Sequence, residues 1–200
     1  MATPLGILTF QKAIRGGVRP NLFAVNHAFP GGVTTPSISG VENGGEVTYM
    51  CKSAALPATN VGTVELPFRG RVIKVPGDRT YETWTATFYM DDAFELRAAY
   101  EKWISLTNGV DANIASADIV NTWQDITISQ LDKFGGATGA ADSQLTTIRE
   151  YKLVQAFPVS VSQVSVAYDN NDSFEEFDVE FAYQYHESTG GSNETSRSLD

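Results

Sequence analysis

The sequence is short of the side chains that most enzymes use for nucleophilic and metal chemistry. Its 200 residues include one cysteine and two histidines, with no glycine-rich phosphate loop and no metal-spaced His/Cys set. The single cysteine, Cys51, excludes an internal disulfide, and its place beside an apolar strand pattern favours a small core residue. A catalytic thiol would require His27 or His186 as a nearby base, which no motif indicates. We therefore predict a protein that is not an enzyme and needs no metal or cofactor.

Positive charge is also scarce. Lys and Arg number 14 against 24 Asp and Glu, which gives a formal net charge of −10. Proteins that grip nucleic acid usually carry a basic patch that neutralises phosphates, so this balance argues against tight DNA binding. A soluble acidic protein with a solvated surface accounts for the same charge.

Long hydrophobic runs are missing as well. No stretch approaches the roughly 18 apolar residues of a membrane-spanning helix, and no early run has the length or flanks of a signal peptide. We therefore expect the chain to stay in the cytoplasm of the cell that makes it. Hydrophobic residues still make up 42% of the sequence, which at this length supports one globular domain.

The clearest structural signal is a period of two within the run 47–92. Trp84, Ala86 and Phe88 occupy alternate positions with threonines between them, which is typical of a strand with one buried face. Before it, Pro76–Thr80 combines a fixed φ, a glycine and an aspartate, and this combination predicts a tight connection.

Further strands are predicted where β-branched and aromatic residues alternate or cluster. They span Arg19–Phe29, Glu46–Lys52, Val64–Phe68, Arg69–Val75, 125–128, Ile148–Ala156, Val159–Tyr168 and Phe174–Tyr185. The strands at 64–68 and 69–75 could form one long, bent hairpin arm. A phase slip near Ser162-Gln163 suggests a bulge or turn.

Two helical segments are predicted. Residues 93–106 carry an apolar stripe of Leu96, Tyr100 and Trp103, with two aspartates before its first turn. The segment Leu5–Ile14 has apolar residues at spacings of three and four and could be a short helix or an arm that reaches a neighbour. The residues alone therefore indicate a mainly β protein of short antiparallel strands with one packed helix.

An ordered series of short runs carries a family resemblance. The runs are Arg19–Phe23, Cys51-Lys52, Ala55–Ala58, Gly70-Arg71, Ile73–Val75, Gly77–Thr80, Trp84-Thr85, Phe157–Val159, Tyr168–Asn171 and Phe177–Val179. Single runs of this kind arise by chance, but an ordered series rarely does. In their order and spacing the chain resembles, over roughly residues 19–185, the tail tube proteins of contractile-tailed bacteriophages, the group that includes the T-even phages.

The resemblance implies an antiparallel β-barrel or sandwich flanked by a helix. It also implies hexameric rings that stack into the inner tube of a contractile tail, a conduit for DNA delivery into the host. The implied partners are the sheath, baseplate and tail terminator proteins, while genomic DNA passes through without specific binding. The implied location is the virion tail, assembled in the host cytoplasm.

Two departures from the family pattern predict loop insertions, at 30–45 and at 111–147. Apart from these, we expect a single domain over residues 1–186. The polar segment 187–200 is predicted to be a flexible tail.

Five charged residues on the predicted arm are candidate subunit contacts: Arg69, Arg71, Lys74, Asp78 and Arg79. Arg69 and Arg71 are two apart, so a strand would project them from one face. As a nucleic-acid patch they lack interleaved aromatics and oppose the overall charge. A solvated face, or salt bridges to an acidic neighbour at an oligomer interface, is the favoured interpretation.

Four carboxylates on the last predicted strand are candidate lumen or ring-contact residues: Glu175, Glu176, Asp178 and Glu180. The last three alternate with apolar residues, so one face of that strand is acidic. A lumen lined by carboxylates would repel phosphate, and DNA could slide along it.

Other interpretations remain open at the level of sequence. The tube of a phage-derived contractile injection or secretion system would look alike. An acidic β-sandwich that binds carbohydrate, or a hydrolase, would be a monomer with exposed aromatics such as Trp123. The stretch 169–180 has the spacing of a calcium loop but carries Phe174 where that loop requires glycine, so chance explains it better.

Overall fold

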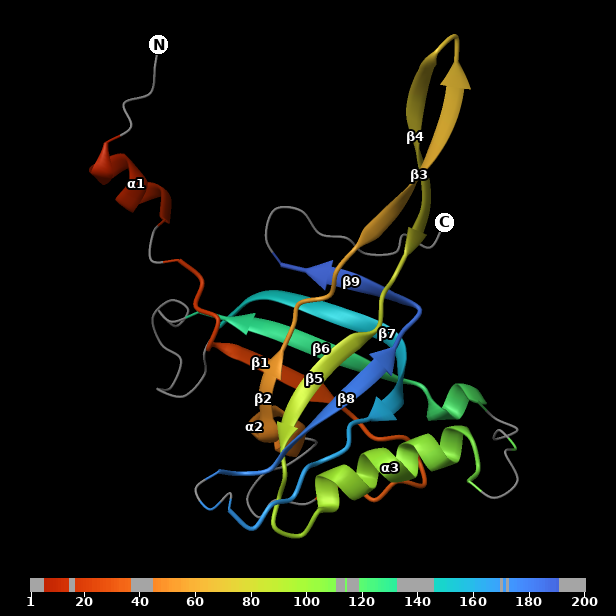
Figure 1. Cartoon of the computed structure of the whole chain (residues 1–200). Coiled ribbons are helices and arrows are strands. Elements are labelled where there is room, and N and C mark those ends of the chain that lie inside the picture. The colour runs from red at the N-terminus through yellow and green to blue at the C-terminus, as the bar shows by residue number, and fades with distance from the viewer. Residues whose placement is uncertain are drawn as a thin grey trace.

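The computed structural model describes residues 6–14, 17–36, 45–110, 114, 119–132, 146–169, 171 and 173–190. In chain order the elements are α1 (Ile7–Ile14), β1 (Phe23–His27), α2 (Gly45–Met50), β2 (Cys51–Ala54), β3 (Asn60–Phe68), β4 (Arg71–Thr80), β5 (Trp84–Tyr89), α3 (Glu95–Thr107), the 3-10 turn η1 (Ile119–Thr122), β6 (Gln124–Leu131), β7 (Thr147–Val161), β8 (Glu176–Ala182) and β9 (Tyr185–Thr189). Figure 1 shows two sheet layers beside α3, with β3 and β4 extending away from them.

The main sheet has the strand order β1-β6-β7-β8-β5-β2, and β9 pairs with β7 outside this path. Every strand pairing among the described residues is antiparallel. The two outermost strands, β1 and β2, do not pair, so the sheet curves without closing into a barrel. At this seam the Thr48 hydroxyl of α2 donates to the Val25 carbonyl of β1 at 2.7 Å. The predicted class, a mainly β sandwich with a packed helix, is confirmed.

Strand β7 belongs to both layers. Its first part pairs with β6 and β9, and its last part, from Phe157 to Val161, pairs with β8. The change of layer occurs next to Gln155, which has a φ of 55°, and the Gln155 amide donates to the Asp125 carboxylate at 3.0 Å. The two strands predicted at 148–156 and 159–168 are therefore one strand, and it ends at Val161 before the predicted slip.

The core lies between the inner sheet faces and α3. It collects the predicted alternating residues of β5 and β8 and the predicted aromatic stripe of α3, among them Phe88, Phe181 and Trp103, all fully buried. The indole of Trp103 donates to the Thr122 carbonyl at 2.7 Å. The Asp91 carboxylate accepts the first amides of α3, from Glu95 at 2.8 Å and Leu96 at 3.2 Å, which satisfies donors that the helix itself leaves unpaired.

Three predicted elements are wrong. The strand predicted at Glu46–Lys52 is helix α2 up to Met50, because Val47 is buried while Tyr49, which a strand would place on the same side, is exposed. The connection predicted at Pro76–Thr80 is part of β4. The strand predicted at Phe174–Tyr185 divides into β8 and β9, because the chain leaves β8 after Ala182 and returns to the other layer along β7.

The predicted insertion at 111–147 includes the strand predicted at 125–128, which is part of β6. It contains η1 and β6, and β6 is an interior strand between β1 and β7. Strand β9 continues to Thr189, so ordered chain extends into the predicted tail at 187–200. Residues 37–44 of the other predicted insertion lie outside the described residues, and the division into one domain stays a prediction.

The core contains one buried histidine. His27 on β1 is 4% exposed, and its Nδ1–H donates to the Ala28 carbonyl at 3.0 Å. Its Nε2 is therefore free to accept the Tyr100 hydroxyl of α3 at 2.8 Å. Burial lowers the pKa of His27 from 6.5 to about 4, because the low-dielectric core disfavours the charged ring. This neutral pair joins the first strand to α3.

We expect His27 to make the folded state sensitive to acid. Because its pKa is higher in the unfolded chain, the unfolded state takes up the proton first, and stability falls as pH falls from about 6.5 towards 4. The His27 contribution to the loss is about 2 kcal/mol between pH 6.5 and pH 4.5. Urea unfolding of the wild type and of the His27→Leu/Tyr100→Phe double variant at both pH values would measure it. Equal losses in the two proteins would contradict the assignment.

Candidate subunit interfaces

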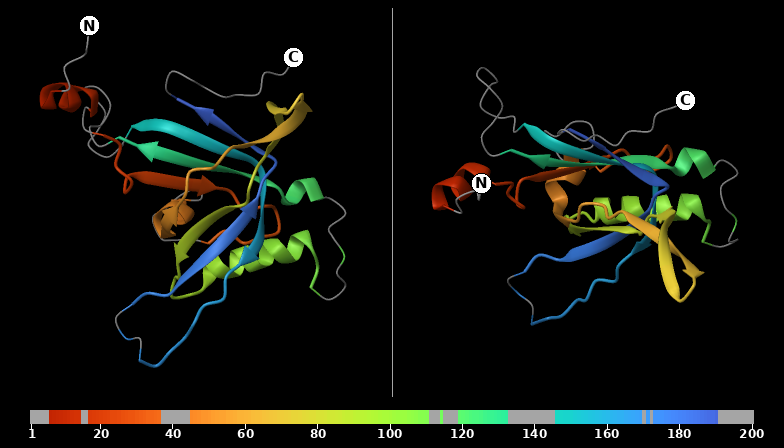
Figure 2. Two further views of the ribbon diagram at one scale, coloured as in Figure 1. Left: turned by 45° about the horizontal axis from the view of Figure 1, so that its top comes forward. Right: turned by 90° about the horizontal axis from the view of Figure 1, so that it is seen from above.

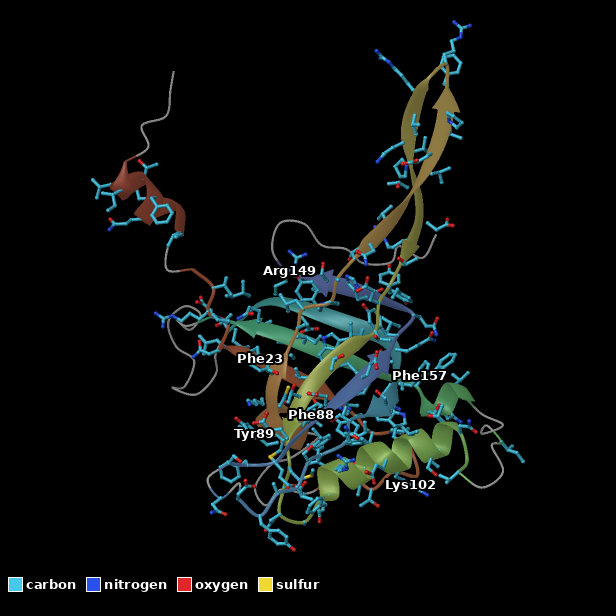
Figure 3. The ribbon with its side chains drawn as sticks, in the orientation of Figure 1. Phe23, Phe88, Tyr89, Lys102, Arg149 and Phe157 are labelled. Atoms are coloured by element: carbon cyan, nitrogen blue, oxygen red, sulfur yellow. The ribbon has the colours of Figure 1, made fainter. Side chains whose placement is uncertain are left out.

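The hairpin β3–β4 is exposed along almost its whole length. It pairs Val64 with Val75 and Leu66 with Ile73, and Figures 1 and 3 show it extending beyond the sheet layers. Because side chains alternate along each strand, these four residues and Phe68 share one face. All five are exposed, between 40% and 60%. A two-stranded hairpin is marginally stable in water, so an uncovered apolar face of this kind indicates a partner.

The five predicted contact residues lie at two different places on this hairpin. Arg69 is in the turn with a φ of 45°, so it does not share a strand face with Arg71, and that expectation is wrong. Lys74 lies 3.5 Å from Glu65 across the strands, on the face opposite the apolar one. Arg71 is on the apolar face near the tip.

The remaining two predicted contacts, Asp78 and Arg79, lie at the base of the hairpin. There β3 and β4 are out of register between Val61 and Thr63, and a Cβ at Gly77 would come within 3.2 Å of the Gly62 backbone. The turn-forming residues that predicted a connection here instead allow a bulge with close backbone approach.

The structure brings three of the four predicted carboxylates into one row on the outward face of β8. Glu176, Asp178 and Glu180 stand opposite Tyr89, Thr87 and Thr85 of β5, respectively. Glu175 precedes the strand, and its carbonyl accepts the Met90 amide at 2.9 Å.

The acidic row is held by hydroxyls and one lysine. The Thr87 hydroxyl donates to Asp178 at 2.7 Å, and the Ser160 hydroxyl donates to Glu180 at 3.2 Å. Lys52 of β2 contacts both oxygens of Glu176 at 2.6 Å, and this pairing raises the pKa of the lysine. The sequence did not single out Lys52, because its partner is 124 residues away.

The outward face of β5 and β8 is polar because buried apolar and outward-facing polar side chains alternate along both strands. Phe88 lies in the core, whereas its neighbour Tyr89, labelled with it in Figure 3, lies outside with the Lys52 ammonium 5.9 Å from its ring centre. Carboxylates, hydroxyls and a phenol therefore cover the outside of β5 and β8. Such a surface offers hydrogen-bond partners to water and repels polyanions.

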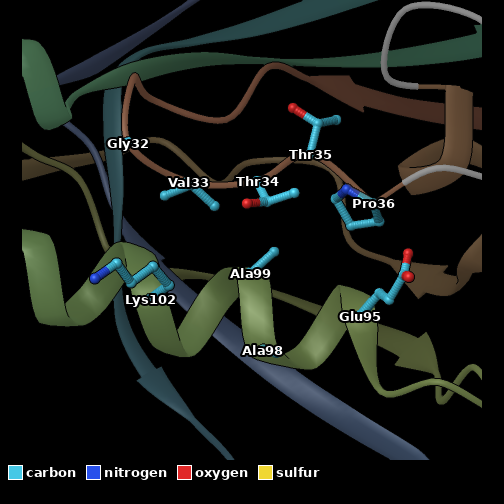
Figure 4. Close-up of a pocket in the computed structure, with 9 residues that line it drawn as sticks. All are labelled: Gly32, Val33, Thr34, Thr35, Pro36, Glu95, Ala98, Ala99 and Lys102. Carbon is cyan, nitrogen blue, oxygen red and sulfur yellow. The ribbon is translucent and has the colours of Figure 1, made fainter.

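A separate cleft of about 440 Å³ lies between α3 and the segment Gly32–Pro36. Figure 4 shows Glu95 and Lys102 over different turns of α3, with Ala99 between them. None of the predicted site residues lines this cleft. Within the described ranges, no three or more His, Cys, Asp or Glu side chains are grouped as a metal ion would require.

Cys51 is a buried thiol, and its Sγ–H donates to the Ser53 carbonyl at 3.7 Å. Burial raises its pKa from 9.0 to about 12, so the reactive thiolate is scarce at neutral pH. The part of the chain that the structure describes has no helix long and apolar enough to cross a membrane.

Comparison with known proteins identifies the family of this chain. A family model described as "Phage tail tube protein" matches residues 18–189. The chain belongs to this family. The tail tube protein gp19 of Enterobacteria phage T4 is 28% identical over 169 residues, which are 84% of this chain and 90% of that protein. The tail tube protein of Serratia phage KSP90 is 25% identical over 138 residues, covering 69% and 72% of the two chains.

Two solved structures with a similar fold come from larger assemblies. A chain from the baseplate of the anti-feeding prophage has a TM-score of 0.58 at 13% identity. The match covers 95% of the present chain and 98% of the prophage chain. A chain from the sheath-tube complex of an extracellular contractile injection system has a TM-score of 0.58 at 17% identity, with coverages of 92% and 98%. At these identities the likeness concerns the fold.

In the monomer, we expect the backbone amides of the hairpin to be less protected from hydrogen exchange than those of the other paired strands. Its β3 and β4 amides lack a covering layer, so they should exchange with deuterium at least about 100-fold faster than those of β5 and β8. Exchange measured by mass spectrometry in dilute and concentrated protein would test this. Protection equal to that of β5 in the monomer would contradict the view that the hairpin requires a partner.

Proposed function

We propose that this protein is the structural subunit of the inner tube of a contractile phage tail, built from stacked hexameric rings. The observation that supports this most directly is the exposed apolar face of β3–β4, which a monomer leaves in water. Identical subunits in a closed ring and stack would cover such faces and the unpaired edges of β1 and β2. Family membership supplies the kind of assembly.

The proposed lumen surface is the outward face of β5 and β8, with Glu176, Asp178 and Glu180. A ring repeats this row in every subunit, so the hole would carry a dense negative potential. Phosphates would be repelled from the wall, and genomic DNA would pass without binding specifically. The candidate contacts Arg71 and Lys74 would then serve protein partners on the hairpin.

The proposed partners beyond the ring are the sheath, the baseplate and the tail terminator, and the proposed location is the virion tail, assembled in the host cytoplasm. This is supported by the similar structures, one of which comes from a baseplate and another from a sheath-tube complex. The acidic, hydroxyl-rich face and the protonated Cys51 support a structural role over catalysis.

A second candidate is the tube of a contractile injection system, which the fold likeness to such a sheath-tube complex favours. The same ring of subunits would serve a phage tail tube and an injection-system tube. Particles purified from the producing cell would separate them, because a phage tail is joined to a DNA-filled head and an injection system is not.

Negative-stain microscopy of the purified protein across a concentration series, with solution mass in parallel, tests the assembly. We expect rings or hollow tubes from the wild type. Leu66→Asp, which puts a charge on the apolar face of the hairpin, should raise the concentration needed for assembly by about tenfold or more. Thr63→Asp puts the same charge on the opposite face of β3 and is the matched control. Assembly of both variants at wild-type concentrations would contradict the role of this face.

The lumen assignment predicts a separate effect on DNA delivery. Asp178→Lys in the intact phage should leave tubes normal but lower infectivity by about tenfold or more, because each subunit would then present an ammonium group that can bind phosphate. Glu101→Lys makes the same charge reversal on the exposed side of α3 and should leave infectivity unchanged. Normal infectivity of the Asp178→Lys phage with normal tubes would remove β8 from the lumen.

A further inference from the structure

Helix α1 carries an apolar face that the rest of its own chain does not cover. Ile7, Phe10 and Ile14 fall within about a third of the helix circumference, and all three are more than half exposed. Every other side chain described on α1 is exposed as well. Figure 1 shows the helix apart from the sheet layers, on the same side as the hairpin. An amphipathic helix of two turns is not stable alone in water, so it requires a surface to pack on.

Helix α1 lies outside the part of the chain that the family model matches. The family model begins matching at residue 18, after α1 ends at Ile14. The eight residues between Ile14 and Phe23 could span up to about 28 Å when extended, which is enough to reach a neighbouring molecule. The role of α1 is therefore argued from its own chemistry.

The charge of this segment is opposite to that of the remaining chain. The first 41 residues contain Lys12, Arg15 and Arg19 and no carboxylate side chain. The remaining residues contain 11 of the 14 basic side chains and all 24 acidic ones, a formal charge of −13. A basic amphipathic helix therefore favours an acidic surface with exposed apolar side chains.

The described residues offer such a surface at the end of the molecule away from the hairpin (Figures 1 and 2). We call it the acidic rim, and it combines the start of α3 with the connection between β7 and β8. Its exposed apolar side chains are Phe94, Val166, Tyr168 and Phe174, and its carboxylates are Asp91, Asp92, Glu95, Asp169 and Glu175.

Two contacts join the two parts of the acidic rim. The Met90 amide, just before α3, donates to the Glu175 carbonyl at 2.9 Å. The Tyr89 and Phe174 rings lie 6.5 Å apart between centroids. Phe174 and Glu175 of the β7–β8 connection therefore lie next to the residues that lead into α3.

The hairpin is another exposed apolar surface, and its charge makes it a poorer acceptor than the acidic rim. Residues 60–80 contain four basic side chains and the two carboxylates Glu65 and Asp78, a net charge of +2. Lys12 of α1 would be repelled there and attracted at the acidic rim.

We propose that α1 docks through Ile7, Phe10 and Ile14 onto the acidic rim of a second copy of this chain. The proposal rests on the tube function, in which copies lie head to tail with the α1 and hairpin side of one copy facing the rim of the next. In that arrangement α1 is a strap that adds a contact to those of the family domain.

Cross-linking between differently labelled copies tests the docking. Phe10→Cys protein is mixed with Phe174→Cys or Tyr168→Cys protein at concentrations that assemble, and a short bismaleimide is added. Cys51 serves as a silent background, because burial keeps its thiol protonated. We expect a cross-linked heterodimer, at a yield about tenfold above that from Thr9→Cys, which lies on the opposite side of α1.

The outcomes separate this proposal from the tube function. Tubes in the microscope without a cross-link to the acidic rim would overturn the docking and leave the tube function standing. A cross-link in dimers that never form rings would support the docking and contradict the tube function. Cross-linking of Phe10→Cys to Leu66→Cys of the hairpin would overturn the choice of acceptor. A membrane is the alternative partner of α1. It would be shown if the protein floats with anionic phosphatidylglycerol vesicles, if Phe10→Asp abolishes this flotation, and if no cross-link to the acidic rim forms.

Discussion

The pairing of β7 with three strands is the constraint on which the rest of the fold depends. One strand of fifteen residues holds β6 and β9 in one layer and β8 in the other. The positive φ of Gln155, tied to Asp125, marks the change of layer. Because β7 pairs in both layers, the inner faces of the two layers share one core. Helix α3 covers this core, and the His27–Tyr100 hydrogen bond links α3 to β1. The outward face of β5 and β8 is then left polar.

The same construction explains why function lies outside the core. The core buries the inward-facing apolar residues of β5, β8 and α3, whereas the hairpin β3–β4 leaves a row from Val64 to Phe68 and its cross-strand partners in water. A protein that functions as a single copy would have little reason to carry such an arm. The chemistry of the acidic row, with hydroxyls bonding Asp178 and Glu180, suits a wall along which a polyanion slides. The apolar face of the hairpin and the acidic row therefore both suit a subunit that functions in an assembly.

The sequence predicted what depends on local alternation and on family resemblance. Phe88 and Trp103 were assigned to the core correctly because each repeats the period of its element. What failed depends on partners far along the chain. Glu46–Lys52 alternates like a strand but folds as α2 up to Met50, and the turn-like Pro76–Thr80 is extended by pairing with β3. The row from Glu176 to Glu180 was predicted, but its lysine partner was not, since nothing local links Lys52 to β8.

The most direct measurement is a helical reconstruction of the assembled tube by electron cryomicroscopy at side-chain resolution. It should place Glu176, Asp178 and Glu180 on the lumen wall and bury Val64, Leu66 and Ile73 against another subunit. A map in which the acidic row faces the sheath side, or in which the hairpin remains uncovered, would contradict the view that this fold is built around assembly into a DNA conduit.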